Sequence, residues 1–152
     1  EYLAKYVASK THVKIISWKG KCEVHEQFTD KEIIELRKKY PNLKVVSHPE
    51  CPPEVIKVSD YTGSTGSMIN YVKNTNAKDI FLVTECSMSD NIQIENPNIN
   101  FVKPCNLCPH MKKITLQGIL KSLKNENNYV EIDSKTIQRA RGAIERMIAV
   151  GR

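Results

Sequence analysis

The chain has 152 residues, of which 40% are hydrophobic and 26% charged, an ordinary mixture for one domain or two small ones. Its apolar runs, such as 80–83, are far shorter than the roughly 20 residues that span a bilayer, and its first residues lack a signal-peptide pattern. The net charge is +6, but aromatic residues are only 7% and scattered. The charge is compatible with a solvated basic surface or with small anionic partners, and we expect a cytoplasmic protein with no membrane contact and no nucleic-acid ligand.

The first half of the chain alternates between helical and strand patterns. The best-supported helix begins at Thr29, which forms a capping-box pattern with Glu32, and ends before Pro41. The predicted elements are, in order, a helix over 1–9, a strand over 13–18, a helix over 29–40, a strand over 43–47, a short helix over 53–57 and a strand over 58–61.

The second half continues the alternation. A helix is expected after the 63–66 turn, followed by a buried strand over 80–83 and short strands over 101–102 and 129–132. Thr115 and Ser134 are expected to cap two amphipathic helices near the carboxyl terminus. The fold class predicted from this alternation is α/β, a three-layer αβα domain with a short and mainly parallel sheet.

The first residue is not Met and lies inside a predicted helix, so we expect the chain to be the carboxyl-terminal portion of a longer protein. Residues 1–24 then form the end of an incomplete upstream α/β domain. Residues 25–110 form an α/β domain, and residues 111–152 form a segment whose two helices pack back on the rest.

Cysteine, histidine and glutamate cluster after three predicted strands. The clusters are Cys22-x-x-His25, His48-Pro49-Glu50-Cys51 and Cys105-x-x-Cys108-Pro109-His110. Ligands gather at the carboxyl ends of parallel strands, so the three clusters can converge on one site. Without a secretory signal, cysteines are more often metal ligands or catalytic groups than disulfides.

Each cluster also has a structural interpretation. Cys51 and Cys86 can be small buried apolar residues, and His48 can be a hydrogen-bonded structural histidine. The Cys-x-x-Cys pair is compatible with a metal site, a redox pair or a local disulfide. If the site is catalytic, Glu50 and His25 are the candidates for proton transfer.

The turn Gly63-Ser64-Thr65-Gly66 opens a predicted helix, where backbone N–H groups and two hydroxyls can bind a phosphate or carboxylate. The alternative is a simple Ser or Thr cap followed by a turn glycine. The turn lacks the Walker lysine and the dinucleotide spacing, so neither ATP nor NAD is indicated as a ligand.

Five motifs together resemble the quinolinate synthase family over about residues 13–123. They are Trp18-x-Gly20-x-Cys22-x-Val24-His25-Glu26, His48-Pro49-Glu50-Cys51, Asp60-x-x-Gly63-Ser64-Thr65, Thr84-Glu85 and Cys108-Pro109-x-Met111-Lys112-x-Ile114-Thr115-Leu116. The resemblance implies three similar α/β domains with pseudo-threefold symmetry around a [4Fe–4S] cluster. It implies a transferase reaction in NAD biosynthesis, which condenses iminoaspartate (iminosuccinate) with dihydroxyacetone phosphate and releases phosphate and water.

The resemblance also assigns roles to individual residues. It makes Cys22 and Cys108 the cluster ligands of this chain, with the third cysteine in the missing amino-terminal domain, so that the fragment alone is inactive. The cysteine that matches Cys51 in the family is not a ligand. Catalysis would use His25, His48 and Glu50. The substrate site would comprise these three residues together with Ser64, Thr65 and Met111. A functional link to L-aspartate oxidase, which supplies iminoaspartate, is also implied.

Cys105 is found in only some members of the family. It is either a spare thiol or the partner of Cys108 in a reversible disulfide that removes a cluster ligand. Two other functions stay open from the residues themselves. One is a zinc-binding module built from the Cys and His clusters, and the other is a non-catalytic phosphate-binding domain that uses only the 63–66 turn.

Overall fold

The computed structural model describes residues 1–102, 105–126 and 129–151, which form two compact units, Glu1–Lys112 and Lys113–Arg152. The elements of the first unit are α1 (Tyr2–Ala8), η1 (His25–Gln27), α2 (Asp30–Lys39), β1 (Lys44–Ser47), α3 (Pro53–Lys57), β2 (Tyr61–Thr62), α4 (Thr65–Asn74), β3 (Asp79–Val83), α5 (Ser87–Glu95) and β4 (Asn100–Phe101). The 3₁₀ turn η2 (Met111–Lys113) leads into the second unit, which contains α6 (Leu116–Asn125) and α7 (Ser134–Val150).

The strands of the first unit form one sheet in the order β2-β1-β3-β4, and every pair is parallel. The central pair is in register from Lys44 opposite Ile80 to Ser47 opposite Val83. Helices connect consecutive strands, as parallel pairing requires. The predicted α/β class with a parallel sheet is therefore confirmed.

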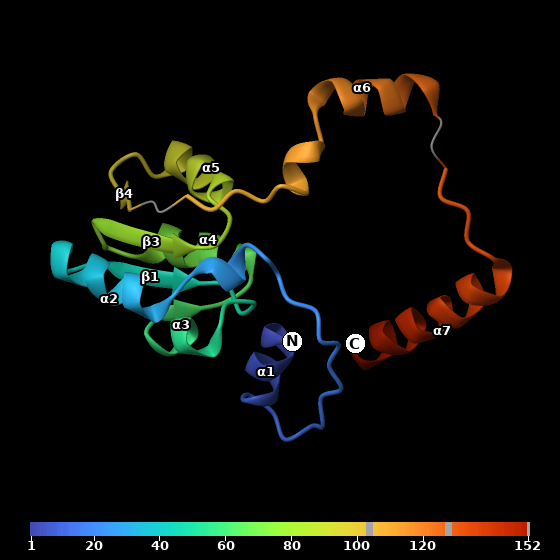
Figure 1. The fold of residues 1–152 in the computed structure, drawn as a ribbon, viewed down its shortest axis with the longest axis horizontal. Coiled ribbons are helices and arrows are strands. Elements are labelled where there is room, and N and C mark those ends of the chain that lie inside the picture. Colours follow the sequence, from blue (N-terminus) through green and yellow to red (C-terminus); the bar gives the residue numbers. More distant parts are fainter. Residues whose placement is uncertain (103–104, 127–128, 152) are drawn as a thin grey trace. The chain divides into compact units, whose positions relative to one another are not determined.

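The sheet is buried on both faces, because alternate residues of β1 and β3 enter two separate cores. On one face Val45 and Phe81 pack with Ile33 of α2 and Val55 of α3. On the other face the core combines strand residues with residues of α4 and α5; its members are Val46, Met68, Val72, Ile80, Leu82, Ile92 and Phe101. The first unit thus has the predicted three αβα layers, seen around β1 and β3 in Figure 1.

Most of the predicted elements are present. The capping box of Thr29 and Glu32 starts α2 as expected, and α3 coincides with the predicted short helix. The predicted strand over 13–18 is wrong, because this segment pairs with no strand in the described part of the chain and Trp18 is 87% exposed. The predicted strand over 129–132 is wrong for the same reason, since its residues are exposed and unpaired. Helix α5 was not predicted, and its apolar pattern is weak.

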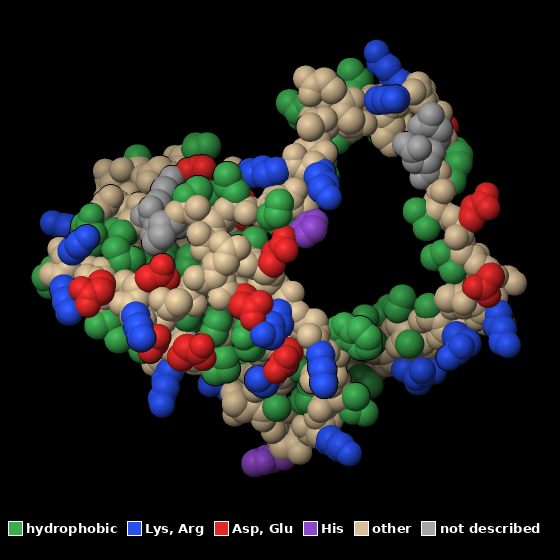
Figure 2. Space-filling model, in the orientation of Figure 1, with side chains coloured by type: hydrophobic (Ala, Val, Ile, Leu, Met, Phe, Trp, Pro, Cys, Tyr) green, Lys and Arg blue, Asp and Glu red, His purple; other side chains and the backbone are tan. Residues whose placement is uncertain are grey.

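The second unit contains two amphipathic helices. Thr115 caps α6 as predicted, whereas α7 is capped by Asp133 and not by Ser134, because the Asp133 carboxylate accepts from the Thr136 amide at 2.9 Å. Along α7 the apolar side chains gather on one side (Figure 2); those exposed are Ile137, Ile144, Met147, Ile148 and Val150. No helix among the described residues is both long and apolar enough to cross a membrane. The packing of residues 111–152 on the rest of the chain stays a prediction.

Asp60 connects strand β1 to helix α2 through hydrogen bonds. Its carboxylate accepts from the Val45 amide at 2.8 Å, from the Arg37 guanidinium at 2.7 Å and from Lys44 Nζ at 3.3 Å. Burial opposes its ionisation, but these donors outweigh burial and hold the pKa of Asp60 below its ordinary value. The aspartate therefore stabilises the start of β1 as a carboxylate.

Replacing this carboxylate should destabilise the first unit. We expect Asp60→Ala to lower the free energy of unfolding by roughly 2–4 kcal/mol, because it leaves the buried Val45 amide without its acceptor and removes one of the acceptors of the Arg37 guanidinium. Urea unfolding measures the loss. The matched control is Glu35→Ala, which removes only an exposed pair with Lys38 and should change stability by less than about 0.5 kcal/mol. Equal effects of the two substitutions would contradict this role of Asp60.

Candidate functional site

The carboxyl ends of β1 and β3 place two polar residues side by side. Ser47 and Val83 are the last paired residues of the two strands, and the ladder continues with the His48 amide donating to the Val83 carbonyl at 3.3 Å. The next residue after β3 is Thr84. The register of the central strands therefore fixes His48 and Thr84 as neighbours at one edge of the sheet.

The turn around η1 adds a third group to this edge. Val24 and Phe28 on either side of η1 are buried in the core, and the Phe28 ring meets Phe81 edge-on at 5.9 Å. The Glu26 amide donates to the Cys22 carbonyl at 3.0 Å and closes the turn. Between these two anchors, His25 is turned into the site and is only 7% exposed.

His25, His48 and Glu50 form a compact cluster. The two imidazole rings are stacked with centroids 4.7 Å apart. Glu50 Oε2 lies 3.4 Å from Nδ1 of His25 and 3.5 Å from Nδ1 of His48. The Glu50 amide donates to His48 Nδ1 at 3.3 Å, so this nitrogen is an acceptor and Nε2 carries the ring proton of neutral His48. His25 Nε2 and Thr84 Oγ1 form a hydrogen bond of 3.0 Å.

Both histidines are held neutral near pH 7. Burial, reinforced by the neighbouring His48, lowers the pKa of His25 to about 4. Burial also lowers the pKa of His48, although the Glu50 carboxylate opposes this shift. Two neutral imidazoles beside a carboxylate can accept protons without first being deprotonated, and can later return them.

These side chains open onto a cavity of about 320 Å³ at the carboxyl end of the sheet. The cavity brings together seven of the residues predicted for the site, namely Cys22, His25, His48, Glu50, Thr65, Cys108 and Met111. Four further lining residues were not predicted as site residues: Val24, Thr84, Glu85 and Met88. The Thr84-Glu85 pair belonged to a recognised motif, but nothing in the sequence gave it a role.

The turn before α4 is shaped by the backbone of β1. The Gly63 amide donates to the Ser47 carbonyl at 3.2 Å, and a Cβ on Gly63 would lie 2.9 Å from side-chain atoms of Tyr61 and Ser67. Ser64 caps α4 by accepting from the Ser67 amide and does not line the cavity, whereas Thr65 does. Anion binding by Ser64 and Thr65 stays a prediction.

The loop that carries Cys108 is fastened to the end of β3. A disulfide joins Cys86 to Cys105, and the Cys86 amide donates to the Asn106 carbonyl at 3.2 Å. The expected alternatives for Cys105, a spare thiol or a bond to Cys108, are therefore wrong. The reason is spatial: the loop runs beside the residues that follow β3, which bring the two Cα atoms within 5.1 Å.

Cys22 and Cys108 are suitable ligands for an iron–sulfur cluster. Both are free, half-buried thiols that line the same cavity although they come from distant loops. The Cys108 sulfur already accepts from the Met111 amide at 3.5 Å, a contact typical of thiolate ligands. Cys51 is unsuitable, because its buried thiol donates to the Val83 carbonyl and burial raises its pKa to about 12. Cys22 and Cys108 are therefore the two thiols of this chain that are suited to bind an iron–sulfur cluster.

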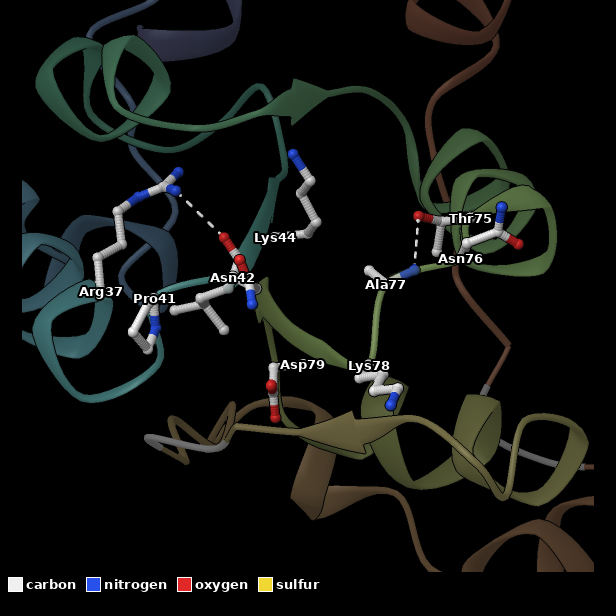
Figure 3. Close-up of a pocket in the computed structure, with 10 residues that line it drawn as sticks. Arg37, Pro41, Asn42, Lys44, Thr75, Asn76, Ala77, Lys78 and Asp79 are labelled. Atoms are coloured by element: carbon white, nitrogen blue, oxygen red, sulfur yellow. Dashed lines mark hydrogen bonds between the residues drawn. The ribbon is translucent and has the colours of Figure 1, made fainter.

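A second cavity lies at the amino ends of the central strands, next to Lys44 and Asp79 (Figure 3). Some of its polar groups already have local partners: Arg37 donates to the Leu43 carbonyl at 3.1 Å, and Thr75 accepts from the Ala77 amide at 3.3 Å. It contains none of the predicted site residues, and parallel sheets bind ligands at the opposite end.

Fold and site together define an α/β protein whose parallel sheet presents thiols, imidazoles and a carboxylate in one cavity. Residues 1–149 match the family model described as quinolinate synthetase A protein, and the chain belongs to this family. It is 53% identical to quinolinate synthase 1 of Mesorhizobium japonicum, 53% to a quinolinate synthase of Sinorhizobium fredii and 49% to one of Xylella fastidiosa. These alignments cover 97–99% of this chain but only 41–46% of the relatives, so the chain spans less than half their length.

The buried imidazole should make stability depend on pH. His25 has a pKa of about 4 when folded and about 6.5 when unfolded, so the unfolded state binds the extra proton between these values. The free energy of unfolding should therefore fall as the pH falls from about 6.5 to 4, by up to about 3 kcal/mol. Urea unfolding of metal-free chain measures the slope. His25→Gln should flatten it, whereas the exposed His12→Gln should not; identical profiles for both variants would refute the assignment.

The cysteines should differ in reactivity. In the native chain handled in air, iodoacetamide should label Cys22 and Cys108, because both are accessible free thiols. Cys51 should stay unlabelled until the chain unfolds, and Cys86 and Cys105 should appear as one crosslinked peptide. Peptide mapping by mass spectrometry tests all three expectations. A crosslink between Cys105 and Cys108, or labelling of native Cys51, would contradict the structure.

Proposed function

We propose that this chain forms the catalytic carboxyl-terminal part of a quinolinate synthase, a [4Fe–4S]-dependent transferase of NAD biosynthesis. The reaction is the condensation of iminoaspartate with dihydroxyacetone phosphate, with loss of phosphate and water. Membership of the family and the names of its relatives support this assignment. Because iminoaspartate is an oxidation product of aspartate, a functional link to L-aspartate oxidase in the cytoplasm is part of the proposal.

The observation that carries the proposal is the convergence of Cys22 and Cys108 on the cavity that also contains His25, His48 and Glu50. Separate structural cysteines would not be expected to meet beside the buried His25 and the half-buried His48. Thiolates are the usual ligands of iron–sulfur clusters. When bound with one iron open to substrate, such a cluster supplies a Lewis acid for polarising hydroxyl or carbonyl oxygens.

The protein's own residues would move the protons. A condensation with loss of water needs a base to take a proton beside a carbonyl and an acid to protonate each departing oxygen. Glu50 Oε2 lies 3.4 Å from Nδ1 of His25 and 3.5 Å from Nδ1 of His48, so its negative charge would favour either ring when that ring takes up a proton. His48 presents its Nε2 proton as a donor, because its Nδ1 is engaged by the Glu50 amide.

Substrate binding would use the rim of the same cavity. Thr65, in the first turn of α4, offers a hydroxyl close to the positive end of that helix, where an anionic phosphate or carboxylate is favoured. Ser64 would contribute at the helix cap, and Met111 would cover the apolar side of the substrate. Both substrates are anions, which suits the net charge of +6.

A third cluster cysteine would come from a part of the protein that this chain does not contain. Cys51 is buried, and Cys86 and Cys105 are joined to each other, so neither Cys22 nor Cys108 has a third free thiol beside it in the cavity. We therefore propose that the 152-residue chain alone is inactive and that activity needs the remaining half found in its relatives.

The test is metal analysis of a longer protein, made by joining this chain to the unmatched half of the Mesorhizobium relative. Purified without oxygen, it should contain about four irons and four sulfides and form quinolinate from the two substrates. Cys22→Ser and Cys108→Ser should each lose the cluster and the activity. The chain alone should show neither.

The matched control is Cys51→Ser, which removes a thiol of the same neighbourhood that is not a proposed ligand. It should retain the iron content even if it lowers stability. Iron content unaffected by Cys22→Ser or Cys108→Ser would overturn the assignment of ligands. Protein with a full cluster that forms no quinolinate would overturn the reaction.

A further inference from the structure

Three donor groups in the site lie close enough together to share one metal ion. One ligand atom each from Cys22, His25 and Glu50 lies within 4.8 Å of the other two, and Cys108 is not part of this group. We propose that these three residues bind a single divalent cation of zinc type, and that this cation competes with the cluster for Cys22. Binding of the cation goes beyond the proposed function and does not depend on it, whereas the competition for Cys22 rests on the proposed cluster.

The first support is an unpartnered buried atom. His25 is 93% buried, and its Nδ1 has no hydrogen-bond partner among the residues that the structure describes, because the contact with Glu50 Oε2 at 3.4 Å lacks hydrogen-bond geometry. A buried polar atom without a partner costs about 1–3 kcal/mol. A cation between Nδ1, the thiolate and the carboxylate would remove this cost.

Thr84 prepares the histidine for this role. Its hydroxyl lies 3.0 Å from His25 Nε2 and is fixed at the end of β3. When Nε2 donates its proton to Thr84, the lone pair of the neutral ring is on Nδ1, the nitrogen that faces Glu50. Histidine ligands in metal sites usually donate their second N–H to such an outer partner. Thr84 is therefore proposed as a positioning residue and not as a ligand.

The donor set selects the class of cation. One sulfur, one nitrogen and one carboxylate oxygen suit Zn²⁺, whereas Mg²⁺ and Ca²⁺ prefer oxygen ligands alone. Three protein ligands leave the fourth tetrahedral position to water. On binding, the Cys22 thiol releases its proton to solvent as the sulfur–metal bond forms. This site differs from the zinc module considered from the sequence, which also used Cys105 and Cys108.

The test is titration of the 152-residue chain with Co²⁺ and Zn²⁺ under anaerobic conditions. Co²⁺ should produce a thiolate-to-metal charge-transfer band at one equivalent, and Zn²⁺ should abolish this band by displacing Co²⁺. Cys22→Ser should abolish the band. His25→Gln and Glu50→Gln should each weaken Zn²⁺ binding about tenfold or more, because each removes a ligand. Cys108→Ser should leave both the band and the Zn²⁺ affinity unchanged.

Thr84 is tested by a matched pair of variants. Thr84→Val removes the hydroxyl at nearly constant volume and should weaken Zn²⁺ binding about 10–100-fold, whereas Thr84→Ser should restore it. Circular dichroism and urea unfolding of each variant show that the fold is retained. A band that survives Cys22→Ser, or is lost equally in Cys108→Ser, would overturn the proposal. The proposed cluster needs both Cys22 and Cys108, whereas the proposed zinc site needs only Cys22, so different results would contradict the two proposals.

Discussion

The parallel pairing of β1 and β3 is the constraint on which the site depends. Because Ser47 is opposite Val83, the first residues beyond both strands, His48 and Thr84, emerge together at one edge of the sheet. A slip of one residue would turn His48 towards the other face and would also exchange the two core faces, at the cost of the buried packing. The same hydrophobic register that stabilises the fold therefore also aligns the polar groups of the site.

Two loops contribute the remaining side chains of the site, and each loop is held in place by a specific contact. The turn at η1 is anchored by Val24 and Phe28 in the core, and His25 between them lines the cavity. The loop of Cys108 is held by the disulfide between Cys86 and Cys105. Rigid attachment of both loops matters chemically, because thiols and imidazoles must be in position before a ligand arrives.

The sequence predicted those helices and strands that are determined by local patterns. The capping box at Thr29 and the apolar run of β3 were sufficient for their elements, because both signals are local. The prediction of a strand over 13–18 was wrong, since strand propensity without a pairing partner does not make a strand. Seven of the eight site residues that the motif resemblance selected line the cavity, and their roles stay predictions. The resemblance missed the partner of Cys105 and the contact of Thr84 with His25, because both depend on contacts between distant segments.

The central claim is that Cys22 and Cys108 face one common metal centre beside His25 and Glu50. The most direct test is X-ray diffraction at the iron absorption edge from anaerobic crystals of the longer, cluster-containing protein. The account predicts one compact anomalous peak within bonding distance of both sulfurs, in the cavity at the carboxyl ends of β1 and β3. An iron peak bonded to only one of the two cysteines, or located elsewhere in the protein, would contradict it.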